Sequence, residues 1–181
     1  MSITTPEIQV RTPAENGKKT PFGRGFYQLE EESLYLPIEY RDQKRFYSYL
    51  DSETVSLHLD RAGRLIFIEV DLPRRRWDIK ENFIPPEIVK PGEARFLDFR
   101  KSLKKPQIFC DCNRDNLLIL FDTQPAEQNI SLADNLIAQI TSNGLLTAIW
   151  AFDFTDDMAG REIASWRRSI HKTPLRIPDC A

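Results

Sequence analysis

The stretch Asp60-Arg-Ala-Gly-Arg-Leu-Ile-Phe-Ile68 reads as a tight turn followed by a β-strand, and a related stretch, Thr141-Ser-Asn-Gly-Leu-Leu-Thr-Ala-Ile149, recurs later in the chain. Gly63 and Gly144 pair at an offset of 144 − 63 = 81 residues. Glycine supplies the positive φ that closes such a turn without a Cβ clash. The recurrence predicts that one β-rich unit is present twice.

Short apolar or alternating runs on either side of these turns predict the strands of each copy. Val55, Leu57 and Leu59 alternate with polar residues, which is typical of a strand with one buried face. The predicted strands span 25–30, 33–39, 53–59 and 64–71 in the first copy and 108–112, 116–122, 135–141 and 145–153 in the second. Each copy is predicted to be a four-stranded antiparallel meander. Because one such sheet is marginally stable alone, the two copies are expected to pack together.

The organisation of the chain follows from this duplication. We expect one β-rich domain of the α+β class, mostly β, over residues 23–173 of 181. Its parts are repeat one at 25–72, a proline-marked connection at 73–106, repeat two at 107–154 and a helix at 156–170. Polar, proline-containing residues 1–22 predict a flexible N-terminal arm, and residues 174–181 form a tail.

A helical stripe ends the domain. Ala159, Ile163 and Trp166 recur at spacings of four and three, which predicts one apolar face. We expect Trp166 to pack against the sheet of the second copy, near Ile149 or Ala151.

The 25 basic and 27 acidic side chains leave a net charge of −2. The protein as a whole is therefore not expected to be attracted electrostatically to nucleic acid or to an anionic membrane. No stretch approaches the roughly 18 apolar residues of a membrane helix, and the N-terminus lacks a secretory pattern. Three cysteines are too few for a disulfide framework, so a cytoplasmic location and no membrane partner are expected.

The first copy carries Leu34-Tyr35 and, in its hairpin, Asp60-x-x-Gly63-Arg64-Leu65-x-x-Ile68-Glu69. This pattern resembles a family of small β-rich bacterial domains of unknown function. The second copy departs from it at Thr141, Leu145 and Trp150, where the pattern has Asp, Arg and Glu. The resemblance implies a β-rich fold in a bacterial protein, and it transfers no functional residue.

Catalytic, metal and cofactor sites are not predicted. Cys110 and Cys112 are one residue apart and Cys180 lies in the tail, whereas zinc sites usually take cysteines two to four residues apart plus a second pair. Gly23-Arg-Gly25 leads into a strand rather than a helix, which does not fit a phosphate-binding loop. We therefore expect no catalytic residue, no metal ligand and no cofactor.

Two basic clusters flank the connection and are the candidate binding residues. They are Arg74, Arg75, Arg76 and Trp77 on one side, and Arg100, Lys101, Lys104 and Lys105 on the other. Clustered cations with an adjacent aromatic ring suit a single strand of nucleic acid, whereas a solvated rim paired with nearby carboxylates is the simpler interpretation. The aromatic segment Phe46-Tyr-Ser-Tyr49 could cover a sheet edge or meet a partner.

Three functions are compatible with these observations. The first is a non-catalytic interaction or assembly module that self-associates as a homodimer or binds a protein partner, because sheet edges need pairing or cover. The alternative is a nucleic-acid-associated regulator that uses the basic clusters. A second alternative is an enzyme with a site between the repeats that gathers His58, Glu69 and Asp153.

Overall fold

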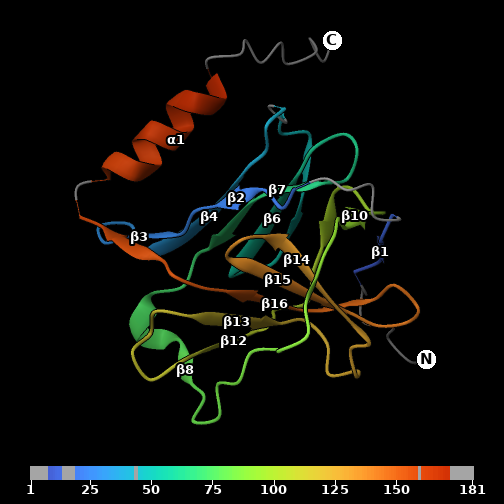
Figure 1. Ribbon diagram of the computed structural model, residues 1–181. Coiled ribbons are helices and arrows are strands. Elements are labelled where there is room, and N and C mark those ends of the chain that lie inside the picture. Colours follow the sequence, from blue (N-terminus) through green and yellow to red (C-terminus); the bar gives the residue numbers. More distant parts are fainter. Residues whose placement is uncertain (1–7, 14–18, 43–44, 159, 172–181) are drawn as a thin grey trace.

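The computed structural model describes residues 8–13, 19–42, 45–158 and 160–171. Over these residues the protein is mostly β, with several sheets and one α-helix near the C-terminal end (Figure 1). This confirms the mostly β, α+β class predicted from the sequence.

Repeat one builds the first sheet. In space, β5 lies beside β6, followed by β7, β4 and β3, and each of these strands is antiparallel to its neighbour. The bounds are β3 (Phe26–Gln28), β4 (Ser33–Glu39), β5 (Ser48–Asp51), β6 (Val55–Leu59) and β7 (Leu65–Val70). Because β4 pairs with β7 and not with β6, the order differs from a simple meander. β5 is a strand that the sequence did not predict.

Repeat two builds the second sheet in the same order. β14 lies beside β15, followed by β16, β13 and β12, again antiparallel throughout. The bounds are β12 (Gln107–Cys110), β13 (Leu117–Leu120), β14 (Gln128–Ala133), β15 (Leu136–Ile140) and β16 (Leu146–Ala151). β14 is the counterpart of β5, and the sequence did not predict it either.

The two hairpins also agree in register. Val55 faces Val70 in repeat one and Leu136 faces Ala151 in repeat two, so both partners shift by 81 residues (136 − 55 and 151 − 70). Each hairpin has an irregularity of register in the last pair before its turn. The same local structure is therefore formed where the sequence pattern recurs.

Both hairpin turns are closed by the same hydrogen bonds. The N–H of Gly63 donates to the carbonyl oxygen of Asp60, and the N–H of Gly144 donates to that of Thr141. Each glycine has a φ of +80°, as the sequence predicted. The side-chain oxygens of Asp60 and Thr141 accept further backbone N–H groups of their own turns.

Short strands are exchanged between the repeats. β8 (Asp78–Ile79) follows repeat one and pairs in parallel with β12 of repeat two. β17 (Thr155–Asp157) follows repeat two and pairs in parallel with β3 of repeat one. Each sheet is thus extended by the segment that follows the other repeat, which ties the two copies into one unit.

The segments after the exchanged strands cover the outer faces of the sheets. After β8, Phe83 packs edge-on against Trp150 of the second sheet, with ring centroids 5.0 Å apart. After β17, Trp166 stacks on Phe67 of the first sheet at 4.2 Å. Each outer face is therefore partly covered by the segment that follows the other repeat.

A two-stranded ribbon of β1 (Val10–Arg11) and β10 (Arg95–Phe96) crosses both hairpin turns. The N–H of Val10 donates to the carbonyl of Gly144, and the N–H of Phe96 donates to that of Gly63, both at 2.8 Å. Ile8 and Val10 are buried. The described part of residues 1–22 therefore contributes to the core, which differs from the flexible arm expected from the sequence.

The main core lies between the two sheets. Leu36, Leu57 and Ile68 of the first sheet and Leu117 and Ile149 of the second are fully buried in it. Burial of such a side chain contributes about 1.5–3 kcal/mol of hydrophobic free energy. This shared core holds the two sheets face to face.

Helix α1 (Arg161–His171) begins later than the predicted 156, because residues 155–157 form β17. The carboxylate of Asp157 accepts the N–H groups of Glu162 and Ile163 at 3.2 and 3.1 Å, and so caps the helix. Trp166 lies on the outer face of the first sheet, so its predicted place near Ile149 and Ala151 is wrong. Figure 1 shows α1 beside β3, on the side of the first sheet that faces away from β13.

The connection at 73–106 packs along both repeats. It contains the 3₁₀ turn η1 (Arg74–Arg76), β8, β9 (Lys90–Pro91), β10 and β11 (Lys101–Ser102). β9 extends the second sheet beside β14, β11 extends the first beside β5, and β2 (Phe22–Gly23) pairs with β4.

The predicted tail at 174–181 lies outside the described residues. In the part of the chain that the structure describes, no helix is long and apolar enough to cross a membrane.

Candidate interaction surface

Four exposed aromatic side chains gather where β5 meets the chain between β10 and β11. Phe46, Tyr47, Tyr49 and Phe99 are 44, 48, 45 and 39% exposed, respectively. On β5 itself, Ser48 and Leu50 point into the protein and Tyr49 points out, as the alternation of a strand requires. We call these four rings the aromatic edge.

The rings of the aromatic edge are fixed by one another. Phe46 stacks beside Tyr49 with an interplanar angle of 15° and centroids 6.3 Å apart. Tyr47 meets Phe99 edge to face at 5.6 Å. Because these contacts already hold the rings in place, binding a partner costs this protein little side-chain entropy at the rings.

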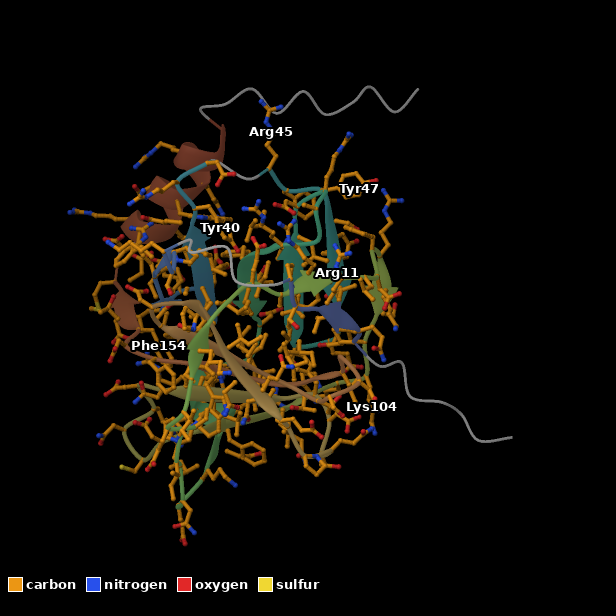
Figure 2. The ribbon with its side chains drawn as sticks, turned by 45° about the vertical axis from the view of Figure 1, so that its right-hand side comes forward. Arg11, Tyr40, Arg45, Tyr47, Lys104 and Phe154 are labelled. Carbon is orange, nitrogen blue, oxygen red and sulfur yellow. The ribbon has the colours of Figure 1, made fainter. Side chains whose placement is uncertain are left out.

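Exposed cations form a basic rim that begins beside the aromatic edge and continues along the sheet edge past β11. The guanidinium of Arg61 lies 5.2 Å from the centroid of the Tyr47 ring. The other exposed cations of this region are Arg45, Arg100, Lys104 and Lys105. Within the described part of the chain, none of these five forms an ion pair with a carboxylate. Figure 2 shows Arg45 and Tyr47 at the upper end of the molecule, with Lys104 lower on the right.

Of the predicted cluster at 100–105, Lys101 is placed differently from its neighbours. Its ammonium group pairs with Asp98 at 3.2 Å, and its backbone pairs with Leu50 in the short ladder between β11 and β5. The ladder explains how the cations come to line this edge, since β11 runs parallel to β5.

The predicted cluster at 74–77 is tied into the fold. Arg74 forms an ion pair with Asp156 at 2.8 Å, and Arg75 pairs with Glu32. Trp77 is only 2% exposed, and its indole N–H donates to a backbone carbonyl. A buried indole is not accessible for stacking on a nucleobase.

The two predicted clusters lie at opposite edges of the first sheet. In the strand order of that sheet, β11 with Lys101 is at one end and β17, which carries the Asp156 partner of Arg74, is at the other. Arg76 is exposed at the second of these edges. The structure therefore does not bring the two clusters together on one surface.

The three residues of the enzyme hypothesis also separate. His58 and Glu69 are neighbours on the outer face of the first sheet, with Nε2 and Oε2 4.0 Å apart, and they do not lie between the repeats. Asp153 lines a different recess, of about 360 Å³, beside Gly23 and Asn135. Burial lowers the pKa of His58 and raises that of Glu69, so the contact is not an ion pair at neutral pH.

A pH prediction follows from His58. Its pKa in the folded protein is below the ordinary 6.5, because burial disfavours the charged imidazole. As the pH falls through 6.5, the unfolded chain gains a proton that the folded chain takes up only at lower pH, so acidification weakens folding. We expect His58→Gln to lose less stability than the wild type between neutral pH and about pH 5.5.

Urea unfolding at the two pH values measures this difference. The raised pKa of Glu69 acts in the opposite direction, since its protonation favours the folded state, but it is present in both proteins and largely cancels. An equal or larger acid loss in His58→Gln would contradict the assignment.

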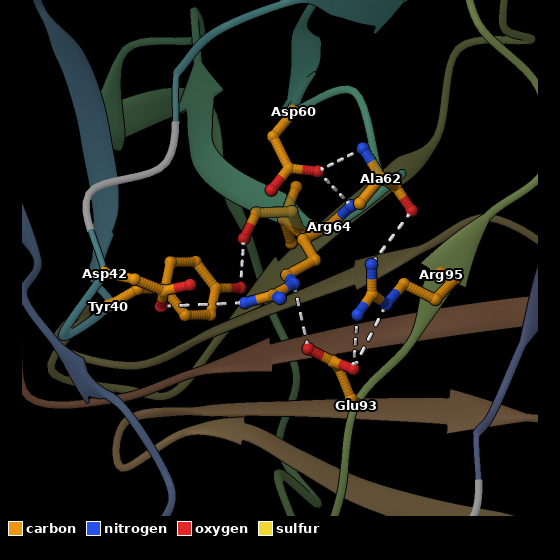
Figure 3. Close-up of polar contacts among 8 residues, drawn as sticks. Tyr40, Asp42, Asp60, Ala62, Arg64, Glu93 and Arg95 are labelled. Atoms are coloured by element: carbon orange, nitrogen blue, oxygen red, sulfur yellow. Dashed lines mark hydrogen bonds and ion pairs between the residues drawn. The ribbon is translucent and has the colours of Figure 1, made fainter.

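A buried arginine organises a second polar cluster (Figure 3). The Nε of Arg64 lies 3.0 Å from Glu93 Oε1, and its Nη1 lies 3.8 Å from Asp42. Glu93 also binds Arg95, whose guanidinium donates to the carbonyl oxygen of Ala62 in the hairpin turn. These contacts tie the turn of repeat one to the connection.

A recess of about 940 Å³ opens beside this cluster, between Arg64, Phe22 and Leu132. Its lining includes as many cations as carboxylates, namely Lys19, Arg41 and Arg64 against Glu39, Asp42 and Glu93. Since Arg64 is already paired, the recess offers no clear charge preference to a ligand.

Cys110 and Cys112, the two cysteines within the described residues, do not form a common site. Cys110 is buried at the end of β12, whereas Cys112 is exposed in the following turn. Burial raises the pKa of the Cys110 thiol. Among the residues that the structure describes, no three His, Cys, Asp or Glu side chains gather in a way that could hold a metal ion.

Comparison with protein-family models finds none that matches the chain, and comparison with curated proteins finds no match either. The resemblance to small β-rich bacterial domains stays an expectation.

Proposed function

We propose that this protein is a non-catalytic interaction module whose binding surface is the aromatic edge. The observation that supports it is the gathering of four exposed rings, Phe46 paired with Tyr49 and Tyr47 paired with Phe99, beside a rim of cations. Aromatic residues and arginine are enriched in binding interfaces and dominate their energetics. An unpaired basic rim favours an anionic partner.

The basic rim bears on the homodimer expected from the sequence. In a two-fold contact, the same patch of both copies meets itself. Two copies joined at the aromatic edge would bring Arg61 and Arg100 close to their own counterparts, and like charges oppose such pairing. These charges therefore disfavour a homodimer joined at the aromatic edge, and sedimentation velocity over a wide range of concentrations tests whether one forms through another surface.

Capture from an extract of the source cells tests the proposed surface. Wild-type protein, a Tyr47→Ala/Phe99→Ala variant and a Phe22→Ala control are immobilised in parallel. Phe22 is a matched control because its ring is 54% exposed but lies in β2, away from the aromatic edge. The molecule captured by wild type is identified, purified and titrated back.

We expect the double variant to bind this molecule at least about tenfold more weakly, because truncating a central aromatic of an interface typically costs about 2 kcal/mol or more. The Phe22→Ala control should bind like wild type. Equal binding by all three proteins would refute the aromatic edge as the binding surface.

A further inference from the structure

We propose, resting on the function above, that the partner bound at the aromatic edge is a single strand of nucleic acid. Unpaired bases would stack on the exposed rings, and the surrounding cations would neutralise the phosphates. This joins two features that come from different parts of the chain, the rings around β5 and the cations of the 100–105 segment.

The rings have the arrangement that stacking requires. Tyr49 and Phe46 are nearly parallel, and Tyr47 stands against Phe99, so ring faces of different orientation are offered over a short distance. Base–aromatic stacking tolerates any sequence, because every base has a π-face. In a duplex the base faces are stacked on one another, so the surface selects unpaired strands.

The cations continue the surface along the sheet edge. From Tyr47 to Asp51 the chain advances four residues, or about 13 Å at the rise of a strand. The chain of β11 runs in the same direction beside β5, and Lys104 and Lys105 follow it after one residue, Leu103. A strand stacked on Tyr47 would thus meet Arg61 and Arg100 first and the two lysines further along.

The net charge of −2 does not prevent this contact, because charges farther away than about 8–10 Å are largely screened at physiological salt. Near the aromatic edge, Asp98 is paired with Lys101, whereas Asp51 and Glu53 are exposed and keep their charge. Five exposed cations that form no ion pair among the described residues stand against these two carboxylates, so positive charge is in local excess. An acidic protein partner would also match this positive charge, but it has no unpaired bases to stack on the rings.

Fluorescence anisotropy with a labelled short oligothymidylate tests the proposal. We expect binding at low salt that weakens as salt rises, with a slope of log K against log salt of about −0.7 for each phosphate neutralised. In Arg100→Gln/Lys104→Gln the slope should become shallower by about 1.4, since two contacts are lost. The matched control is Arg75→Gln/Arg76→Gln at the opposite edge, and its slope should equal that of wild type.

A second pair of variants tests the rings. Tyr47→Ala and Phe99→Ala should each weaken oligothymidylate binding by about tenfold, the effect of losing one stacked base. Phe22→Ala should bind like wild type. All three remove an exposed ring, so unchanged thermal melts establish that the fold is kept. A duplex of the same length should bind more weakly than the single strand.

Two results would overturn the proposal: no binding of oligothymidylate at low salt, or equal losses in the control variants. The outcome is separable from that of the proposed function. If no oligonucleotide binds but the extract, after nuclease treatment, still yields a protein whose capture needs Tyr47 and Phe99, the interaction module stands and the nucleic-acid partner is wrong. If no oligonucleotide binds and no protein is captured through Tyr47 and Phe99, both the nucleic-acid partner and the proposed interaction surface are wrong.

Discussion

Replacing Gly63 by alanine should lower the free energy of unfolding by about 3 kcal/mol or more, the sum of two separate costs. The first is conformational, because the φ of +80° at this position is one that residues with a Cβ rarely adopt. The second is steric, because an alanine Cβ would lie 2.4 Å from the carbonyl oxygen of Phe96. That oxygen belongs to the backbone of β10, so relief would require the ribbon to move off the turn.

Gly160 separates the two costs. Its φ is +66°, but an added Cβ would approach nothing nearer than the side-chain nitrogen of Gln28, at 3.3 Å. Gly160→Ala should therefore show the conformational cost of about 1–2 kcal/mol alone. Gly144→Ala, with the Val10 oxygen at 2.7 Å, should resemble Gly63→Ala. Urea unfolding of the three variants measures these costs. Equal losses of unfolding free energy in Gly63→Ala and Gly160→Ala would contradict the docking of β10 on the turn.

The strands that the sequence predicted correctly are those with strong apolar runs next to a recognisable turn. β5 and β14 were missed for a physical reason. In β5, Ser48 is buried and Tyr49 is exposed, and β14 alternates Asn129, Ile130 and Ser131, so neither strand has the apolar excess of its neighbours. Both are held in place mainly by pairing with the hairpin beside them.

The exchange between the repeats could not be predicted from local pattern. β8 and β17 are two and three residues long, and each pairs with a strand of the other repeat. Such short parallel pairings leave no periodicity in the sequence. Because β17 occupies residues 155–157, the helix cannot begin at the predicted residue 156, and Asp157 caps it from the end of the strand.

The candidate surface was predicted only in fragments. The segment Phe46-Tyr-Ser-Tyr49 stood out because it has more aromatic residues than a solvated loop needs, and the cations at 100–105 stood out as a cluster. Nothing in the sequence joins them, since the ladder between β5 and β11 is two residue pairs long. Arg61 and Phe99 were missed because isolated residues in a turn and a loop carry no pattern of their own.

The two tryptophans at 77 and 166 exchange the roles that the sequence suggested. Trp77 stood beside a basic cluster and looked available to a ligand, but it is 2% exposed and lies edge-on between Tyr27 of repeat one and Phe154 at the end of repeat two. Trp166 looked like a core residue, but it is only partly buried on the outer face, against Phe67.

Trp77→Ala should therefore cost about 3–5 kcal/mol, the loss typical of removing a buried aromatic. The indole also donates to the carbonyl oxygen of Leu72 at 3.0 Å, and truncation leaves that partly buried acceptor without its donor. For a chain of this size, the melting temperature should fall by about 10 °C or more.

Trp166→Ala should lower the free energy of unfolding by less, about 1–2 kcal/mol. The variant loses one ring-stacking contact, and the side chain that it removes is only partly buried. The test is which of the two variants loses more stability. The packing described above predicts that Trp77→Ala loses more than Trp166→Ala. Trp77→Phe serves as the control that keeps an aromatic between Tyr27 and Phe154 while losing the hydrogen bond, and it should fall between wild type and Trp77→Ala. If Trp166→Ala unfolds at a lower temperature than Trp77→Ala, the helix and not the junction of the repeats holds the fold together.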